Sequence, residues 1–326
     1  MEKEIKIELV NSSHYAEIVD LEEFLWASTH EYREKMFFWK YVNTPFLEKC
    51  IGAVAICDNK VVGFRGLIQT EWKYNDLITN TVFTTDAVVH PDYRGLKIMA
   101  KLTTYILDNI KDHYDYLLVL SPNVRSGSVY KSIGTKFFTS FVYYKKPCAI
   151  VFGKRDAVVL NSIDDIWECR ESFEEKSSNC LDAVITKEYY QWKMQEPEKE
   201  FRFITDKDYS AYALLEIRSK NVEIFDFGYR NSLRDVLKLV ESYAHKIGKL
   251  YVNFPLYYNQ EKEYKNVIEN GGYHKYLWLK KIKKSFSPIK SIMIRPIEID
   301  NPDKQNIGDL KHDSPSSWNF KHLLYV

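Results

Sequence analysis

The sequence contains no long apolar segment and no excess of charge of one sign. Its apolar runs are short, such as residues 117–120, whereas a helix that crosses a bilayer needs roughly 20 apolar residues. Lysine and arginine number 46 against 45 aspartates and glutamates over 326 residues, a formal net charge of +1. This balance gives no broad positive field for a nucleic-acid backbone or an anionic membrane. We therefore expect neither nucleic acid nor a membrane among the partners.

Signatures of disulfides, metal sites and secretion are also missing. The five cysteines are an odd number, lie far apart and form no Cys-x-x-Cys pair, and the eight histidines are scattered. Residues 1–10 interleave charged and apolar side chains, which is a strand pattern and not the apolar core of a secretion signal. The sequence therefore predicts reduced, mostly structural cysteines, no metal and a cytoplasmic protein.

A weak internal sequence repeat indicates two similar halves. Segment 38–45, which contains Phe-Trp-Lys and ends in proline, recurs at 191–197 as Gln-Trp-Lys followed by a proline. After each copy come two strand-like runs, an apolar strand, an amphipathic helix (98–110 and 233–247), a buried strand and a short helix. This order predicts a duplicated α+β unit. Aromatic residues make up 15% of the chain, which favours large cores or a stacking pocket.

The most informative stretch is a strand that turns directly into the first amphipathic helix. It runs from Asp86 to Gly95 as Asp-Ala-Val-Val-His-Pro-Asp-Tyr-Arg-Gly. Pro91 ends the strand, Gly95 permits a tight turn, and the helix that follows begins with free backbone N–H groups. Such a junction can hold an anion such as a pyrophosphate.

A second block follows the next buried strand. Asn123, Ser126, Tyr130 and Gly134 are spaced as Asn-x-x-Ser-x-x-x-Tyr-x-x-x-Gly. On a helix the first three share a face, so their amide, hydroxyl and phenol groups can point into one groove.

In these two blocks the sequence resembles the GCN5-related N-acetyltransferases (GNAT). Val89-x-Pro91-x-x-Arg94-Gly95 is similar to the start of the family's acetyl-CoA motif, and Asn123 to Tyr130 with Gly134 to its later segment. One helix and one strand separate the blocks, as that fold requires. The resemblance covers about residues 1–147 and reaches residue 282 only through the repeat. It implies tandem GNAT-like α+β domains, each with a mixed central β-sheet flanked by helices.

The predicted domains are a GNAT domain with the acetyl-CoA site at 1–150, a degenerate copy at 151–284, and a tail at 285–326 that docks on the body. In the second copy, Gly228-Tyr229-Arg230-Asn231 has no proline and no glycine after the arginine. Val267 or Ile268 stands there where the first copy has Tyr130. We expect the second copy to shape the acceptor pocket.

The resemblance implies acetyl-CoA as co-substrate and no metal. The family motif places glycines where this sequence has Lys97 and Met99. Lys97 can crowd the approach of the pyrophosphate, or it can make a charge-assisted contact with the phosphates. The implied cofactor-binding residues are Ala87, Val88, Val89, Arg94, Gly95, Leu96, Lys97, Met99, Ala100, Asn123, Ser126 and Tyr130.

The implied reaction is direct attack of an amine on the acetyl thioester. Tyr130 occupies the family's position for the acid that protonates the leaving thiolate, and Asp86 is the carboxylate nearest to the expected base. Each has a structural alternative: Tyr130 as a packing aromatic, and Asp86 as a strand-end residue bonded to a turn. The sequence leaves monomer and homodimer open.

The resemblance implies a small-molecule amine as the acceptor. The Trp-Lys/Tyr-Pro segments at 39–45 and 192–197 are similar to those of acetyltransferases in bacterial surface-polysaccharide biosynthesis, which implies an amino sugar or a nucleotide-linked amino sugar. Lysines at 280, 281, 283 and 284 either meet a nucleotide phosphate or guard an edge strand. Two other functions stay open: a FemAB-like aminoacyl transferase, which normally needs tRNA, and a non-catalytic acyl-CoA-binding or ligand-binding scaffold.

Overall fold

A computed structural model of the chain describes residues 4–46, 51–120, 130–148, 155–173, 179–275, 289–298 and 300–320. The chain forms two compact units. Unit 1 combines Met1–Phe138 with Ile292–Ser314, and unit 2 combines Thr139–Ser291 with Pro315–Val326. Each unit is thus built from two stretches of chain that are far apart in sequence. The domain ranges 1–150, 151–284 and 285–326 stay predictions.

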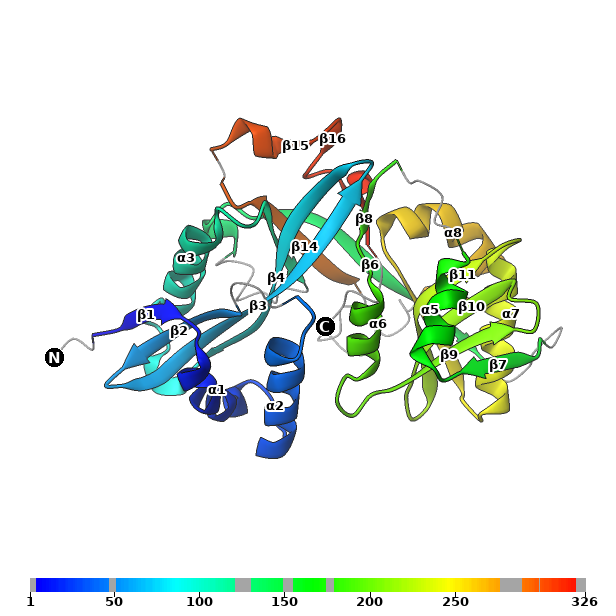
Figure 1. Cartoon of the computed structure of the whole chain (residues 1–326), viewed down its shortest axis with the longest axis horizontal. Helices are drawn as coiled ribbons and strands as arrows, with labels where there is room; N and C mark the ends of the chain where they lie inside the picture. Colours follow the sequence, from blue (N-terminus) through cyan, green and yellow to red (C-terminus); the bar gives the residue numbers. More distant parts are fainter. Residues whose placement is uncertain are drawn as a thin grey trace. The chain divides into compact units, whose positions relative to one another are not determined.

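Unit 1 is built on a mixed sheet (Figure 1). The strand order is β1-β2-β3-β4-β5-β14. The β4–β5 pair is parallel, and the other neighbouring pairs are antiparallel. The strands are β1 (Lys6–Leu9), β2 (Gly52–Cys57), β3 (Lys60–Tyr74), β4 (Leu77–Val89), β5 (Tyr116–Leu120) and β14 (Ile289–Pro296).

Helices cover both faces of this sheet. Adjacent residues of a strand point to opposite faces, and Gly63 of β3 lies against Ile98 and Leu102 while the Phe64 ring packs on Tyr41. One face therefore carries α3 and the other carries α1, α2 and the turns beside them. These elements are α1 (Tyr15–Leu21), η2 (Glu22–Phe24), α2 (His30–Phe37), the π-helical turn η3 (Phe38–Val42) and α3 (Ile98–Ile110).

The apolar spacing of α3 explains its position. Its buried side chains recur every three or four residues and form one stripe that faces the sheet: Ile98, Leu102, Ile106, Leu107 and Ile110. The helix predicted at 98–110 is therefore confirmed. Strand β14 completes the sheet because the short run Ile292 to Ile294 is buried beside β5, where Ile292 pairs with Leu120.

Unit 2 repeats this plan. Its sheet has the order β6-β12-β11-β10-β9-β7, in which only the β11–β12 pair is parallel. The strands are β6 (Lys136–Pro147), which pairs through residues 142–147, β7 (Ala157–Leu160), β9 (Glu200–Asp206), β10 (Ala211–Ile217), β11 (Asn221–Tyr229) and β12 (Tyr251–Leu256). The helices are α5 (Ile163–Glu171), α6 (Lys187–Met194), α7 (Leu233–Lys246) and α8 (Tyr258–Asn270). Short strands are β8 (Leu181–Ala183), which pairs with β17 (Trp318–Asn319), and β13 (His274–Lys275), which pairs with β6.

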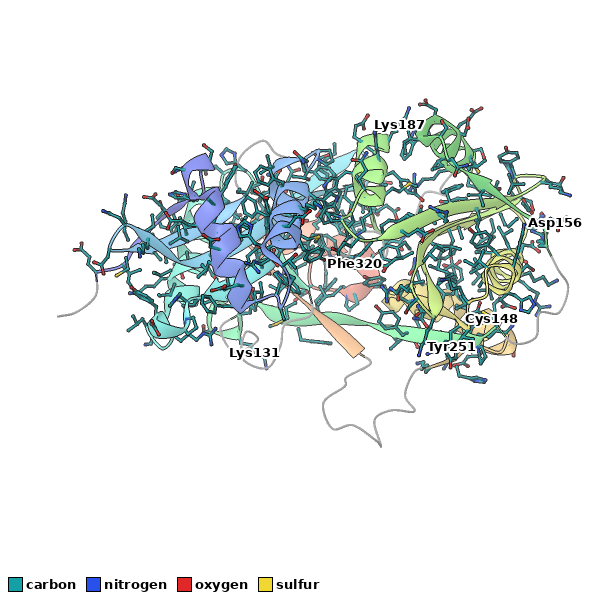
Figure 2. The ribbon with its side chains drawn as sticks, turned by 90° about the horizontal axis from the view of Figure 1, so that it is seen from below. Lys131, Cys148, Asp156, Lys187, Tyr251 and Phe320 are labelled. Atoms are coloured by element: carbon teal, nitrogen blue, oxygen red, sulfur yellow. The ribbon has the colours of Figure 1, made fainter. Side chains whose placement is uncertain are left out.

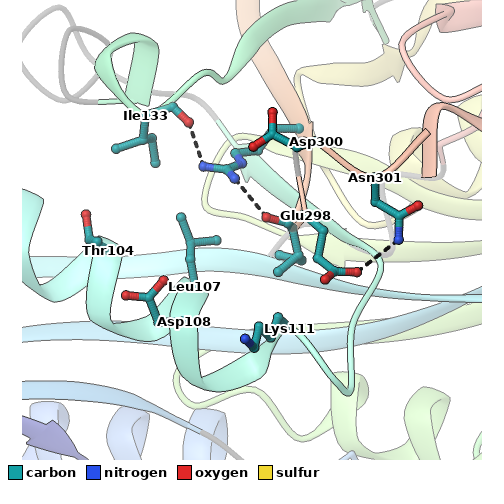
Figure 3. A pocket seen from close by; sticks show the side chains of 10 residues that line it. Thr104, Leu107, Asp108, Lys111, Ile133, Glu298, Asp300 and Asn301 are labelled. Atoms are coloured by element: carbon teal, nitrogen blue, oxygen red, sulfur yellow. Dashed lines mark hydrogen bonds between the residues drawn. The ribbon is translucent and has the colours of Figure 1, made fainter. Parts of the chain in front are cut away.

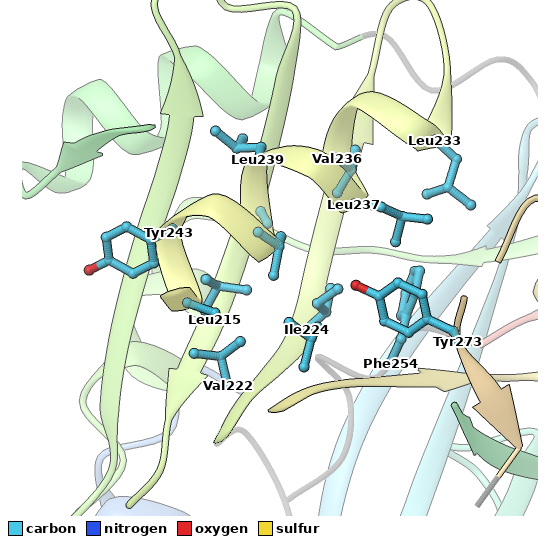
Figure 4. Packing of buried hydrophobic residues seen from close by; sticks show 14 of the residues in the cluster. Leu215, Val222, Ile224, Leu233, Val236, Leu237, Leu239, Tyr243, Phe254 and Tyr273 are labelled. Carbon is cyan, nitrogen blue, oxygen red and sulfur yellow. The ribbon is translucent and has the colours of Figure 1, made fainter. Parts of the chain in front are cut away.

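The core of unit 2 forms where α7 packs on its sheet (Figure 4). The apolar stripe of the helix, including Val236 and Leu237, meets Ile224 and Phe254 of the strands. Cys148, labelled in Figure 2, belongs to the same core, and burial raises the pKa of its thiol to about 11. The four cysteines that the structure describes are free thiols.

The two units share one order of elements. In unit 1 it is β2, β3, β4, α3 and β5, and in unit 2 it is β9, β10, β11, α7 and β12. Each series is an antiparallel meander followed by a helix and a parallel strand. The predicted α+β architecture of mixed sheets flanked by helices is confirmed.

Candidate active site

A β-bulge marks the centre of unit 1. Arg65 of β3 pairs with Ala87 of β4, whereas Leu67 pairs with Thr84. Thr85 and Asp86 therefore lie opposite a single residue, Gly66, and the bulge bends β4 at this point.

Only glycine fits at position 66. A Cβ there would lie 2.0 Å from the Tyr41 hydroxyl and 2.7 Å from Thr85 Oγ1. The absence of a side chain lets the α2 face of the sheet close against the bulge.

Strands β4 and β5 part just before the bulge. Their described pairing runs from Thr81 and Tyr116 to Thr84 and Val119. Residues 87–89 of β4 pair with β3 alone among the described residues. This part of β4 contains the predicted cofactor contacts Ala87, Val88 and Val89, and no strand among the described residues pairs with its other edge.

The predicted anion site lies at the exposed start of α3. The chain leaves β4 through the 3₁₀ turn η4 (Pro91–Tyr93), and Arg94, Gly95, Leu96 and Lys97 are exposed. The first turn of the helix, with Met99 and Ala100 half-buried, has N–H groups without intrahelical partners.

The backbone explains why glycine suits position 97. Lys97 is the N-cap of α3 with φ 56°, in the left-handed region, and its side chain makes no capping hydrogen bond. Gly95, two residues earlier, has φ 89°. A lysine in the left-handed region costs about 1–2 kcal/mol relative to the right-handed one, and glycine avoids that cost.

Tyr130 lies where β4 and β5 part. Its side chain is 4% exposed, and its hydroxyl donates to Thr84 Oγ1 at 3.1 Å. The Arg65 guanidinium carbon lies 5.1 Å from the centroid of its ring. The structure thus brings the second sequence block next to the first. The other two residues of that block, Asn123 and Ser126, lie outside the described residues, as do the lysines at 280, 281, 283 and 284.

Asp86 faces the opposite side of the sheet. Its Oδ2 accepts hydrogen bonds from Lys40 Nζ at 2.9 Å and from the Tyr41 hydroxyl at 2.6 Å. Lys40 and Asp86 are both buried, at 5% and 7% exposure. Burial and the Asp86 charge raise the pKa of Tyr41 well above its usual value. The Trp-Lys segment noted in the repeat therefore supplies the partners of this carboxylate.

Glu22 adds a second buried carboxyl to this face. It begins η2, directly after α1, and is 2% exposed. Burial, followed by the negative charge of Asp86, raises its pKa to about 8, although the charges of Lys40 and Arg33 act in the opposite direction. Glu22 is therefore mostly protonated at neutral pH.

Aromatic side chains border these carboxyl groups at the surface. Phe24 and Trp26, which follow Glu22 in the chain, are 39% and 46% exposed. The Lys40 ammonium lies 5.9 Å from the Trp26 ring, and the Phe24 ring packs edge-on against His90 at 4.9 Å. A ligand that approaches this surface would meet aromatic faces first.

The sequence patterns did not indicate Glu22, Lys40, Tyr41 or Arg65. A signal existed for Arg65, because a charged residue inside the apolar strand 61–68 is rarely buried without a reason. No comparable signal separates Glu22 from the adjacent Glu23, which is exposed.

Unit 2 contains an aspartate, Asp226, at the position that corresponds to Asp86 in unit 1. Asp226 stands three residues before the end of β11, as Asp86 does in β4. It accepts hydrogen bonds from Arg170 Nε at 3.1 Å, Tyr212 at 3.2 Å and Tyr190 at 3.3 Å. A buried strand-end aspartate held by a cation and a phenol is thus common to both units, which favours a structural role for Asp86.

A separate hollow of about 640 Å³ lies at the other end of α3 (Figure 3). Charged side chains of both signs line it, including Asp108, Lys111 and Glu298. Its buried Arg295 donates to the carbonyls of Ile133 and Ile297 at 2.6 and 2.8 Å. This hollow is at the C-terminal end of the helix, away from the anion site.

Two further searches concern the described part of the chain only. No helix there is long and apolar enough to span a membrane. No group of three or more His, Cys, Asp or Glu side chains is placed to hold a metal ion there.

Solved structures show where this fold occurs. An Enterococcus faecalis protein described as a probable N-acyltransferase superposes with a TM-score of 0.69 at 10% identity, over 91% of this chain and 73% of its own. A GCN5-related N-acetyltransferase from Kribbella flavida gives 0.63 at 10% identity over 90% and 71%. Eis1 from Mycobacterium abscessus gives 0.56 at 11% identity over 91% and 74%.

The two sequence comparisons gave different results. No curated protein sequence matches this chain significantly. A family model, described as acetyltransferase (GNAT) domain, matches residues 6–138. Those residues contain the bulge, the start of α3 and Tyr130. Residues 6–138 are therefore similar to a GNAT acetyltransferase domain.

Proposed function

We propose that the chain is an acetyl-CoA-dependent N-acetyltransferase that acts on a small amine, with its active site in unit 1. The observation that carries the proposal is the position of the Tyr130 hydroxyl, 3.1 Å from Thr84 Oγ1, where β4 leaves β5. The GNAT match to residues 6–138 supports the same activity.

The residues at this point fit acetyl-CoA. The exposed turn before α3 offers backbone N–H groups to a pyrophosphate, and the β4 edge at 87–89 offers peptide groups to an extended amide chain. Asn123 and Ser126 are predicted to add an amide and a hydroxyl. When bound, acetyl-CoA supplies an acetyl thioester: a C–N bond forms with the amine, the C–S bond breaks, the nitrogen loses one proton and the sulfur gains one.

Tyr130 is the proposed donor of that proton to sulfur. A thiol has a pKa near 8.5 and a phenol near 10, so the transfer needs little tuning. The hydroxyl now donates to Thr84, which holds it at the end of the paired strands. A positioned acid of this kind contributes roughly 10²–10⁴ in rate.

The base is proposed to come from the buried carboxyl pair. Asp86, the predicted base, already accepts two hydrogen bonds on Oδ2 and is neutralised by Lys40. Glu22, whose pKa burial and Asp86 raise to about 8, is ionised in only a minor fraction of molecules at neutral pH, but that ionised fraction is a stronger base than an ordinary carboxylate. We therefore assign removal of the amine proton to Glu22, and we assign to the charge of Asp86 the role of raising the pKa of Glu22.

Thermal unfolding with CoA and with acetyl-CoA tests the proposal. A ligand at 100 times its dissociation constant should stabilise the protein by about 2.7 kcal/mol. No shift at millimolar concentration of either compound would rule out the acetyl-CoA site. A scaffold without catalysis would show the shift but release no thiol with any amine.

A thiol-release assay then identifies the acceptor class. The panel contains free amino sugars, nucleotide-linked amino sugars and amino acids. We propose amino sugars, free or nucleotide-linked, as the class with the highest kcat/KM. Activity that required aminoacyl-tRNA would instead support the FemAB-like alternative. The contribution of unit 2 to acceptor binding stays a prediction.

A further inference from the structure

Arg65 is a buried cation for which the described residues provide no carboxylate within ion-pair distance. It is 3% exposed, and its Nη1 donates to the Thr85 carbonyl at 3.1 Å. Its Nε is buried and has no hydrogen-bond partner among the residues that the structure describes. Burying a charge and an N–H group in this way is unfavourable, so the position requires an explanation beyond packing.

The guanidinium of Arg65 lies against the ring of Tyr130, the proposed acid. The guanidinium carbon is 5.1 Å from the centroid of the Tyr130 ring, within the range of a cation–π contact. Both side chains lie on the α3 face, beside the point where β4 leaves β5. Water is largely excluded there, because Tyr130 is only 4% exposed, and a charge acts more strongly in such surroundings.

Arg65 remains a cation at neutral pH. Burial lowers its pKa to about 10, and the charges of Tyr41 and Asp86 oppose that change. Asp86 does not neutralise it fully, because its carboxylate is paired with Lys40 at 2.9 Å. A positive charge is therefore available on the side of the sheet where a thioester would lie.

We propose that Arg65 is a positioning residue whose charge, acting across the Tyr130 ring, stabilises the negative charge that develops on the leaving sulfur and then on the Tyr130 oxygen. The inference rests on the proposed function. In the step concerned, the Tyr130 O–H bond breaks and an S–H bond forms. The electron pair of the O–H bond stays on the phenolate, which regains a proton from water.

Arg295 offers a matched comparison. It is also a buried arginine of unit 1, at 8% exposure. Its donors reach the carbonyls of Ile133, Pro296 and Ile297 at 2.6, 2.8 and 2.8 Å. Its removal should reduce stability without changing charge at Tyr130.

The test is titration of the thiol of bound CoA, followed by the ultraviolet absorbance of the thiolate, with desulfo-CoA as the blank. The thiol bound to the wild-type protein should titrate below the ordinary value of about 8.5. Arg65→Met should raise the titration midpoint by about one unit, and Arg65→Lys should stay close to wild type. Arg295→Met should leave the midpoint unchanged.

Kinetics provide a second readout. Arg65→Met should lower kcat with little change in the KM for acetyl-CoA, because the charge acts on the transition state more than on binding. Arg65→Lys should recover part of the loss, which a purely structural role of the guanidinium would not predict.

The outcomes separate this inference from the proposed function. If the thiol of CoA titrates at the same midpoint on Arg65→Met as on the wild-type protein, the inference is overturned and the acetyltransferase proposal stays intact. If Arg65→Met does not fold, the wild-type protein still tests the inference. A CoA thiol that titrates at its ordinary value when bound to wild type would also overturn it. Failure of the wild-type protein to bind CoA would overturn both.

Discussion

Single buried charges control the proposed chemistry at the residue scale. Asp86, Lys40 and Glu22 lie within one buried network, so the protonation of one carboxyl depends on the charge of the others. Sequence motifs indicated Asp86 and Tyr130, because each lies in a local block: Asp86 in the strand that turns into α3, and Tyr130 in the block at 123–134. They did not indicate Glu22 or Arg65, whose importance comes from contacts with residues far away in the chain.

Tyr130→Phe should lower kcat by roughly 10²–10⁴ while leaving the dissociation constant of CoA nearly unchanged. The substitution removes the proton donor but keeps the ring that packs beside Arg65. Steady-state kinetics and CoA titration measure the two effects. An equal loss of turnover and CoA affinity would instead support a packing role for Tyr130.

Glu22→Gln should flatten the dependence of stability on pH. The folded-state pKa of Glu22 is raised to about 8, above the usual 4.5, so the folded protein holds a proton that the unfolded chain releases. The associated stability is present in full below about pH 4.5 and is lost as the pH rises to about 8. The glutamine side chain of the variant stays neutral at both pH values. The free energy of unfolding of the variant, relative to that of wild type, should therefore be higher at about pH 9 than at about pH 4.5.

Urea unfolding at the two pH values measures this gain, which we expect to be on the order of a few kcal/mol. Glu23→Gln is the matched control, because Glu23 is the exposed neighbour of Glu22. Parallel pH profiles for wild type and Glu22→Gln would contradict the assignment of a protonated Glu22.

At the scale of elements, two local backbone features shape the site: the bulge in β4 and the left-handed residue before α3. The helix and its start could be predicted, since proline, glycine and a 3.6-residue period are local signals. The bulge could not, because it depends on how β3 and β4 pair and on the Tyr41 hydroxyl that fills the space above Gly66.

Gly66→Ala should destabilise the protein by about 1–3 kcal/mol, since the new Cβ would lie 2.0 Å from the Tyr41 hydroxyl. Chemical denaturation measures the loss. The same substitution in a Tyr41→Phe background should cost less, because the nearest atom is then gone. Equal losses in both backgrounds would show that Tyr41 does not set the limit at position 66.

Lys97→Gly should be more stable than Lys97→Ala by about 1 kcal/mol. Both changes remove the charge, but only glycine adopts φ 56° without steric cost. Urea midpoints of the two variants provide the comparison. A more stable alanine variant would show that residue 97 is not held in the left-handed conformation.

At the scale of the whole molecule, the duplicated order of elements was predictable and the path of strand β14 was not. The repeat is visible because each copy keeps the same sequence of strands and helices. The apolar run at 292–294 is only three residues long, and nothing local in it indicates pairing with β5.

Truncation after residue 284 should destabilise unit 1 and abolish CoA binding. It removes β14, which pairs with all five residues of β5 from Tyr116 to Leu120, and leaves that strand edge and its apolar neighbours uncovered. Unfolding and light scattering measure the effect. Removal of residues 321–326 alone is the control, because it keeps β14; an active truncated protein would contradict the prediction.

Strand β14 also determines when the sheet of unit 1 can be completed during synthesis. Residues 139–288 leave the ribosome before β14, so the sheet of unit 1 stays open beside β5 while the main segment of unit 2 is synthesised. A nascent chain therefore contains the main segment of unit 2 before it contains the segment that completes unit 1. Premature termination anywhere before β14 would yield a protein in which the sheet of unit 1 is unfinished, whatever motifs it already contains.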